Sequence, residues 1–359
     1  MLYNKGMKKF LIAILITVLA ASGAALYARS DIVGKSGGDP IAVTVPEGSG
    51  TIQIAGILER SGVIKNAKLF TLWARKTERD GIWQPGSHEL AKNCGYEAIA
   101  ENLSQTAYIP DIKVTIPEGL QIPEIAKILS EAGVCGKEEF IQACAQFEYP
   151  ESQENTPYPF LTGTDKPGRR KLEGYLFPDT YRFFPDTDPQ EIIDRMLRRF
   201  GEMVCTKERL DRAAELGKSL DEIVILGSVA ESEAVTPEDR RSVAGVFYNR
   251  LKTPGYGKLQ SCVTVEFALG IHKTIINYSD TLTDSPYNTY MYPGLPIGPI
   301  CCPSLVSIDA ALWPEENDYY FFQSDKYGKL WFASTYGQHL SYQKDVQKDW
   351  EVKVRIVGE

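Results

Sequence analysis

Residues 224–230 form an almost wholly apolar segment that ends at Glu231, and this pattern predicts a buried helix. Ser219 is followed three residues later by Glu222, a spacing typical of a capping box, and this marks where the helix begins. At helical spacing Gly227 lies on the same face as Glu231. We expect this glycine to leave room beside the carboxyl group.

A second helix is predicted directly after the first. Thr236 occupies an N-cap position and Pro237 the first helical position. The apolar residues that follow recur along one helical face, at Val243, Ala244, Phe247 and Leu251. The pattern therefore predicts a helix, a sharp turn and another helix, with Glu231 near the corner.

An internal repeat occupies the first half of the chain. Residues 43–48 (VTVPEG) recur as residues 114–119 (VTIPEG). The following positions keep the same offset, because Ile54, Ala55, Ile57, Leu58, Gly62 and Val63 match Ile125, Ala126, Ile128, Leu129, Gly133 and Val134. Each copy predicts a strand, a Pro-Glu-Gly turn and an amphipathic helix stopped by a glycine. The alternative is that the two segments share a turn and helix-cap pattern by chance. The constant offset over both the strand and the helix makes this alternative weaker.

The N-terminal pattern predicts a single membrane anchor. After Lys5, Lys8 and Lys9, residues 10–27 provide about 18 residues without a charge, close to the length that spans a bilayer. Lysines on the leading side place the N-terminus inside and the rest of the chain outside. A cleaved signal peptide, with small residues at 22–24, is the alternative. We favour the anchor because the run is longer than a usual signal core.

Changes in composition suggest the domain limits. Segments rich in Gly, Pro, Ser or Thr before residues 41 and 172 are typical of linkers. We expect a cytoplasmic tip and transmembrane anchor at 1–30, a linker at 31–40, a module at 41–110, a second repeat-related α/β module at 111–150, a connector at 151–171 and the last domain at 172–359. The predicted class is α+β: an N-terminal transmembrane helix, small α/β modules, then a mixed α+β domain.

Composition excludes several function classes. The chain has 359 residues, 43% hydrophobic and 24% charged, which fits a globular protein of two or three domains. Its net charge is −8, and the one basic run beyond the N-terminus is short, at 169–171, so no nucleic-acid partner is expected. HExxH, GxSxG, P-loop and Rossmann motifs are absent from the sequence. No cofactor is implied.

The seven cysteines show no CxxC pair and no metal-ligand spacing with the three histidines. We therefore predict no metal site. The thiols are interpreted as mostly buried, with disulfide pairing left open.

The candidate chemistry rests on Glu231. A carboxyl group held against apolar neighbours resists ionisation, so it can retain a proton at neutral pH, as a general acid must. The alternative is a structural carboxylate, either paired or solvated near a helix end, because most glutamates near helix ends do nothing chemical.

Several motifs together resemble the endolytic murein lytic transglycosylase family, the MltG or YceG-like proteins. The motifs are, in order, LEGYLFPDTY at 172–181, SVAESE at 228–233, VAGVFYNRL at 243–251, LQ at 259–260, YNTY at 287–290 and GLPIGPI at 294–300. The resemblance runs from the anchor to about residue 350 and is strongest from residue 172 onward.

This resemblance implies a fold, an activity and a location. The first extracytoplasmic module, 41–110, is expected to be LysM-like, and 172–359 to be the catalytic domain. The family cleaves the β-1,4 bond between N-acetylmuramic acid and N-acetylglucosamine within nascent peptidoglycan strands, and leaves 1,6-anhydro ends. It is held in the bacterial inner membrane by one helix, with the catalytic part outside. Peptidoglycan synthases are the implied partners.

The family's essential glutamate falls on Glu231. Polar groups that would orient an N-acetyl sugar are expected at Gln260, Asn288 and Tyr290, with loop-stabilising hydrogen bonds as the alternative. Glu173 and Tyr175 are weaker substrate-binding candidates, for which packing is the more natural role.

The chain departs from the family at two points. QSCVT at 260–264 replaces the usual QTDPT, and Leu340 after His339 replaces an asparagine. The first change removes any role for an aspartate in that loop, and the second removes an amide contact at position 340. Neither change touches Glu231.

Two other functions stay open. A muramidase-type hydrolase of the same polymer would need a second carboxylate near Glu231, for which Asp179, Glu266 and Asp284 are possible suppliers. A non-catalytic, membrane-anchored scaffold would bind peptidoglycan through the repeats and would not need Glu231.

Overall fold

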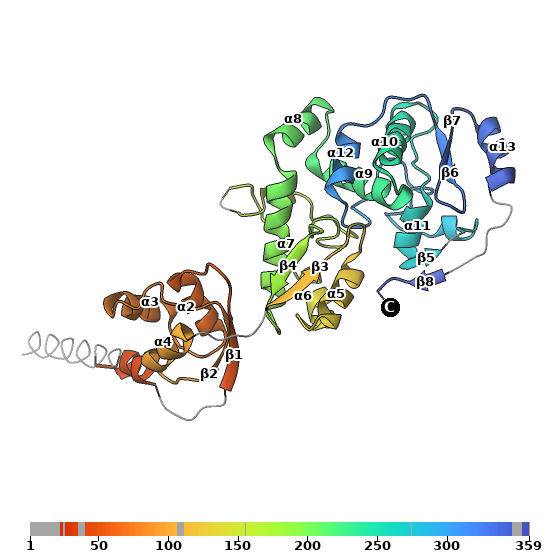
Figure 1. The fold of residues 1–359 in the computed structure, drawn as a ribbon. Coiled ribbons are helices and arrows are strands. Elements are labelled where there is room, and N and C mark those ends of the chain that lie inside the picture. The colour runs from red at the N-terminus through yellow and green to blue at the C-terminus, as the bar shows by residue number, and fades with distance from the viewer. Residues whose placement is uncertain are drawn as a thin grey trace, which may run out of the picture. The chain divides into compact units, whose positions relative to one another are not determined.

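The computed structural model describes residues 22–23, 26–34, 40–105, 111–154, 156–273, 275–346 and 354–358. The chain divides into two compact units, residues 1–111 and 112–359, and each is described by itself. Both combine helices with two-stranded antiparallel sheets (Figure 1). The α+β class predicted from the sequence is therefore confirmed.

The first unit contains the first copy of the repeat. Its elements are β1 (Pro40–Val45), α2 (Thr51–Arg60), α3 (Ala67–Lys76), β2 (Gly86–Ala91) and α4 (Tyr96–Ser104). β1 pairs antiparallel with β2, with Val43 opposite His88. Alternate residues of β1 face a core that includes Ile54, Leu58 and Phe70, all fully buried.

The second copy of the repeat opens the second unit. Its elements are β3 (Ile112–Thr115), α5 (Ile122–Glu131), α6 (Lys137–Ala145) and β4 (Thr180–Phe183). β3 pairs antiparallel with β4, with Val114 opposite Tyr181. Both copies thus have a strand, two helices and a closing strand, and the predicted strand, turn and helix are confirmed in each. The segment 172–183, expected to open the last domain, also supplies the strand that closes this copy.

The rest of the second unit is mainly helical. Its helices are α7 (Pro189–Val204), α8 (Lys207–Glu215), α9 (Leu220–Glu233), α10 (Pro237–Lys252), α11 (Cys262–Leu269), α12 (Leu305–Leu312) and α13 (Tyr336–Val346), with short 3₁₀ turns at Pro159–Leu161 and Asp280–Leu282. β6 (Phe321–Ser324) pairs with β7 (Leu330–Ala333), and β5 (Ile271–Lys273) with β8 (Val354–Ile356). α9, α10 and α12 pack against one another (Figure 1). One hydrophobic core joins these helices to the second copy of the repeat.

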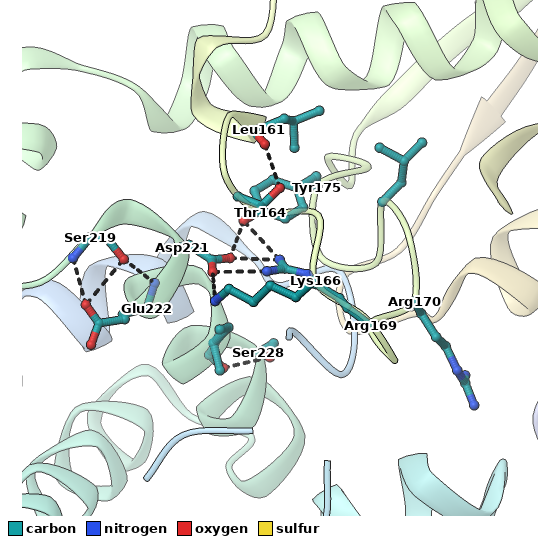
Figure 2. A network of polar contacts seen from close by, with 12 residues as sticks. Leu161, Thr164, Lys166, Arg169, Arg170, Tyr175, Ser219, Asp221, Glu222 and Ser228 are labelled. Atoms are coloured by element: carbon teal, nitrogen blue, oxygen red, sulfur yellow. Dashed lines mark hydrogen bonds and ion pairs between the residues drawn. The ribbon is translucent and has the colours of Figure 1, made fainter. Parts of the chain in front are cut away.

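A buried ion pair ties the start of α9 to the loop before the repeat's closing strand. Arg169, whose side chain is 1% exposed, donates to both carboxylate oxygens of Asp221, at 3.0 and 2.7 Å. The Tyr175 hydroxyl donates to the same carboxylate at 2.6 Å, and Lys166 approaches from the solvent side. Figure 2 shows these side chains converging on Asp221, next to the Ser219–Glu222 capping box. The capping box predicted from the sequence is confirmed.

The N-terminal region is only partly described. Residues 10–21 and 24–25 of the predicted anchor lie outside the described residues. Within the described ranges, no helix is long and apolar enough to cross a membrane. Residues 26–33 are helical, and Asp31 accepts a hydrogen bond of 2.6 Å from the Tyr96 hydroxyl in the first unit.

Candidate active site

Glu231 lies in the last turn of α9, after a stretch in which every residue from 223 to 230 is buried. Its own side chain is 6% exposed. The expectation that Gly227 leaves room beside the carboxyl group is wrong. A Cβ on Gly227 would lie 3.1 Å from the backbone oxygen of Ser307 and 3.3 Å from Cα of Ile308. The missing side chain lets α12 pack directly on α9.

The carboxylate of Glu231 is paired. Arg240, in the second turn of α10, donates from Nη2 to Oε1 at 2.6 Å. Ser304 donates to Oε2 twice, from its backbone nitrogen at 2.9 Å and from Oγ at 2.5 Å. Arg240 also reaches Ser304 Oγ at 3.2 Å. The polar tip of Glu231 is therefore bound by donors, so the wholly apolar surroundings expected from the sequence hold for the helix but not for the carboxylate.

Ser304 has a second role as the N-cap of α12. Its Oγ accepts a hydrogen bond from the Ser307 nitrogen at 3.1 Å while its own proton points to Glu231. The first turn of a helix carries unpaired N–H groups and a partial positive charge. Arg240 and this helix end therefore hold a negative charge at a fixed position.

The Pro-Glu-Gly turn of the second repeat lies against the same side chain. A Cβ built on Gly119 would be 3.4 Å from Cγ of Glu231 and 3.9 Å from its Oε1. The Gly119 nitrogen donates to the backbone oxygen of Cys302 at 2.8 Å, and the Cys302 nitrogen donates to the oxygen of Leu120 at 2.8 Å. This double backbone contact fixes the turn to the loop that carries Ser304.

Glu233, two residues after Glu231, points elsewhere, as its helical direction predicts. Its Oε1 accepts a hydrogen bond of 2.5 Å from the Ser261 hydroxyl. Burial raises the pKa of Glu233 to about 7, helped by the charge of Glu266 and opposed by the Ser261 hydrogen bond. Glu233 thus anchors the segment that follows Gln260.

Gln260 and Tyr290 lie beside this segment. Gln260 is exposed, has a positive φ of 50°, and accepts a hydrogen bond from the Arg250 guanidinium. The Tyr290 hydroxyl lies 3.2 Å from Sγ of Cys262. Both side chains are at least partly accessible, and their contact with a ligand stays a prediction.

The other predicted binding residues are in the interior. Asn288 is fully buried; its amide donates to the backbone oxygens of Thr281 and Thr283, and its oxygen accepts from the Tyr290 nitrogen. Tyr175 is fully buried, and its hydroxyl donates to Asp221. These bonds favour loop stabilisation and packing, the alternative roles that the sequence left open.

Glu173 is also fully buried, with its carboxyl 3.3 Å from the Ile122 nitrogen at the start of α5. Burial raises the pKa of Glu173 to about 8, against the lowering effects of the Arg170 charge and the Ile122 hydrogen bond. The side chain therefore caps α5 from inside the protein.

Glu173 is expected to make the protein less stable as the pH rises. Its folded-state pKa of about 8 lies above the ordinary value of 4.5, so the unfolded chain releases the proton first. The stability that protonated Glu173 contributes is complete below about pH 4.5 and is lost as the pH rises through 8, by on the order of 4 kcal/mol. Urea unfolding of Glu173→Gln from pH 5 to 9 should show a smaller decline than the parent, and Glu233, with its pKa of about 7, still contributes to that decline. The exposed Glu138→Gln should keep the full decline, and equal slopes for all three proteins would contradict the prediction.

In the parts of the chain that the structure describes, no group of three or more His, Cys, Asp or Glu side chains is arranged to hold a metal ion. All seven cysteines are thiols, and Cys135, Cys144, Cys301 and Cys302 are buried.

Comparison with known proteins places the chain in a family. The model of the YceG-like family matches residues 43–345, which include both copies of the repeat and the helices around Glu231. The chain belongs to the YceG-like family. The resemblance found in the sequence motifs is confirmed.

Two relatives and one solved structure are 30–32% identical in sequence to this chain. The endolytic murein transglycosylase of Bacillus subtilis (strain 168) is 32% identical over 332 residues, 89% of this chain and 89% of that protein. That of Streptococcus pneumoniae serotype 2 (strain D39) is 30% identical over 83% of this chain, and the match spans 57% of that protein. The crystal structure of a putative YceG-like protein from Listeria monocytogenes is 31% identical, with a TM-score of 0.59, and covers 85% of this chain and 100% of that one.

Sequence reasoning did not find Arg240 or Ser304 as neighbours of Glu231. Ser304 precedes an apolar segment, LVSIDAAL at 305–312, so its N-cap role could have been predicted. Its contact with Glu231 joins residues 73 positions apart, and no local signal encodes it.

Proposed function

We infer that this protein is an endolytic murein transglycosylase, which cleaves the bond between N-acetylmuramic acid and N-acetylglucosamine inside a glycan strand without adding water. The observation that carries this inference is one buried glutamate, Glu231, held by donors from two other elements, in a chain of the YceG-like family. Two relatives with this name match more than four fifths of the chain.

The reaction needs one carboxyl group in two successive roles. Protonated Glu231 donates its proton to the glycosidic oxygen while the bond from that oxygen to C1 of the muramic sugar breaks. The carboxylate then removes the proton of the 6-hydroxyl, and O6 bonds to C1 to close the 1,6-anhydro ring. Because the nucleophile belongs to the substrate, a catalytic pair of carboxylates of the kind used by ordinary glycosidases is not required. Glu231 ends the cycle protonated.

Arg240 and Ser304 act on the second half of this cycle. Their three hydrogen bonds fix both oxygens of Glu231 and stabilise its charged form, which must accept the 6-hydroxyl proton. The same contacts hold the Glu231 side chain in one orientation. From this one position the carboxyl group can donate the first proton and accept the second.

A hydrolase would need a second carboxylate near Glu231, and the contacts of the three suggested residues do not support this alternative. Asp179 is paired with Arg199, Glu266 accepts from the Lys273 nitrogen, and Asp284 accepts from the Tyr292 hydroxyl. Each is thus held by partners other than the Glu231 site.

Glycan binding by the first repeat copy and a membrane location complete the proposed function. The first repeat copy, two helices over a two-stranded sheet, supports a LysM-like module that binds glycan. Gln260 and Tyr290 would orient the N-acetyl groups. An N-terminal helix would anchor the protein in the inner membrane with its catalytic part outside, close to peptidoglycan synthases that elongate the strand.

The test is end-group analysis of products. Purified peptidoglycan treated with the protein should yield fragments with 1,6-anhydromuramic ends by mass spectrometry. Reducing muramic ends would indicate a hydrolase, and binding without fragments would indicate the scaffold.

A further inference from the structure

Five aromatic rings from three segments of the second unit form one cluster, which we call the aromatic shelf. Tyr256 follows α10, Tyr320 and Phe321 lie where β6 begins, and Tyr336 and His339 belong to α13. β6 packs against both helices (Figure 1). Neighbouring ring centroids lie 4.8 to 6.2 Å apart, from the Tyr256–Tyr320 pair to the Tyr336–His339 pair.

Two rings of the aromatic shelf are open to solvent. Tyr256 is 38% exposed and Tyr336 is 61% exposed, whereas the other three rings are half-buried. Contacts between rings hold both exposed side chains, so little rotamer freedom is left to lose on binding. A tyrosine ring held in this way offers a flat, largely apolar surface, of the kind that packs on the face of a sugar ring.

A buried guanidinium connects the aromatic shelf to Gln260. Arg250 is 7% exposed, and its Cζ lies 5.9 Å from the ring centroid of Tyr256 and 5.7 Å from that of Phe321. Its Nη2 donates to Oε1 of Gln260, and its Nε and Nη1 donate to backbone oxygens. Among the residues that the structure describes, no carboxylate pairs with Arg250, so these uncharged oxygens alone take its hydrogen bonds.

The bond from Arg250 sets the direction of the Gln260 amide. A guanidinium can only donate, so the atom that faces it is the amide oxygen, and the NH₂ group is turned away from it. Gln260 is exposed, and no acceptor for this NH₂ group is found within the described ranges. Its φ of 50° is uncommon for a residue with a side chain, and such conformations cluster at functional sites. Gln260 thus offers two N–H donors to an acceptor from outside the protein.

The aromatic shelf and Gln260 adjoin the last turn of α9, which carries Glu231. Ser261, the neighbour of Gln260 in the chain, donates to Glu233 in that turn at 2.5 Å. An enzyme that cleaves inside a glycan strand must hold sugars on both sides of the broken bond. Each N-acetyl sugar brings a ring face that can pack on tyrosine and an amide oxygen that accepts hydrogen bonds. These two features match the exposed rings and the Gln260 donors.

We propose that Tyr256, Tyr336 and Gln260 form a glycan-binding subsite beside the catalytic carboxyl group, in which the tyrosine rings pack on a sugar and the Gln260 NH₂ group donates to its N-acetyl oxygen. This inference rests on the proposed function and names the part of the substrate that this surface holds. Arg250 is a positioning residue, because its bond to the amide oxygen keeps the two N–H donors directed outward.

Hydrogen exchange of the full chain tests the subsite without relying on cleavage. The probes are two β-1,4-linked hexasaccharides, one of N-acetylglucosamine and one of glucose, which lacks the N-acetyl group. The N-acetylglucosamine hexamer should protect peptides that span residues 253–261 and 335–342. The glucose hexamer should need a concentration at least about tenfold higher for equal protection, since it leaves the Gln260 donors unpaired.

Two variants separate donation from ring packing. Gln260→Glu still presents an oxygen to Arg250, so the loop stays in place, but an oxygen replaces the NH₂ group. Its preference for the N-acetylated hexamer should disappear. Tyr336→Leu should weaken protection by both hexamers about tenfold and keep the preference. The matched control is Tyr278→Leu, at a tyrosine that is 79% exposed and outside the aromatic shelf, and it should bind both hexamers as the parent does.

A Gln260→Glu protein that keeps the parent's preference would overturn the proposal, because a residue that serves only to hold Arg250 would tolerate this change. Protection confined to the first unit, or parent-like binding by Tyr336→Leu, would also overturn it. Failure of the proposed function gives a different result: strands digested by the parent would carry no anhydro ends, whether or not the hexamers protect residues 253–261.

Discussion

Replacing Glu231 by glutamine is expected to lower the rate of glycan cleavage by about 10³-fold or more. Glutamine keeps the size of the side chain but can neither donate a proton to the glycosidic oxygen nor accept one from the 6-hydroxyl. A single general acid or base contributes roughly 10² to 10⁴ in rate, and here one group serves both steps. Initial rates of fragment release from purified strands measure the effect.

Two controls separate this loss from unfolding and from loss of binding. Glu238→Gln, at an exposed glutamate in the first turn of α10, should cleave like the parent. Glu231→Gln should still bind glycan, since its shape is retained. Cleavage at the parent rate by Glu231→Gln would remove this residue from the mechanism and favour the scaffold.

Replacing Asp221 by asparagine is expected to destabilise the second unit by about 3–5 kcal/mol. Removing one partner of a buried ion pair leaves the other charge uncompensated. Arg169 is 1% exposed, and both its Nη1 and its Nη2 donate to Asp221, while Nη2 also donates to the Tyr175 hydroxyl at 3.2 Å. Burial alone would raise the pKa of Asp221, yet the hydrogen bonds and charge of Arg169 lower it below its ordinary value.

Urea unfolding at neutral pH measures this change. The control is Asp211→Asn, because Asp211 pairs with Lys207 at the surface, with side chains 58% and 87% exposed. Exposed pairs of this kind contribute roughly 0–1 kcal/mol. Equal midpoints for the parent and Asp221→Asn would show that Arg169 finds another partner and would contradict the prediction.

The sequence predicted the features that local signals encode. The capping box at Ser219 and Glu222 and the N-cap at Thr236 depend on residues three positions apart, and both form as predicted. The repeat was visible because each copy specifies its own strand, turn and helix. Glu231 was found because it ends an apolar helical segment.

Other features depend on packing between distant segments. Gly227 was interpreted as leaving room beside the carboxyl group, but that space is filled by α12, about 80 residues later in the sequence. Arg240 and Ser304 give Glu231 a polar environment that its neighbours in sequence do not indicate. The pairing of β3 with β4 likewise joins the repeat to a segment assigned elsewhere.

The most direct test of the claim that the substrate's own hydroxyl is the nucleophile is to run the cleavage in ¹⁸O-labelled water. Mass spectrometry then measures the mass of the newly formed muramic ends. If the 6-hydroxyl of the substrate is the nucleophile and Glu231 serves it as acid and base, the products will be anhydromuramic ends without the label. One labelled oxygen per cleaved bond would show that water attacks C1 and would contradict the account.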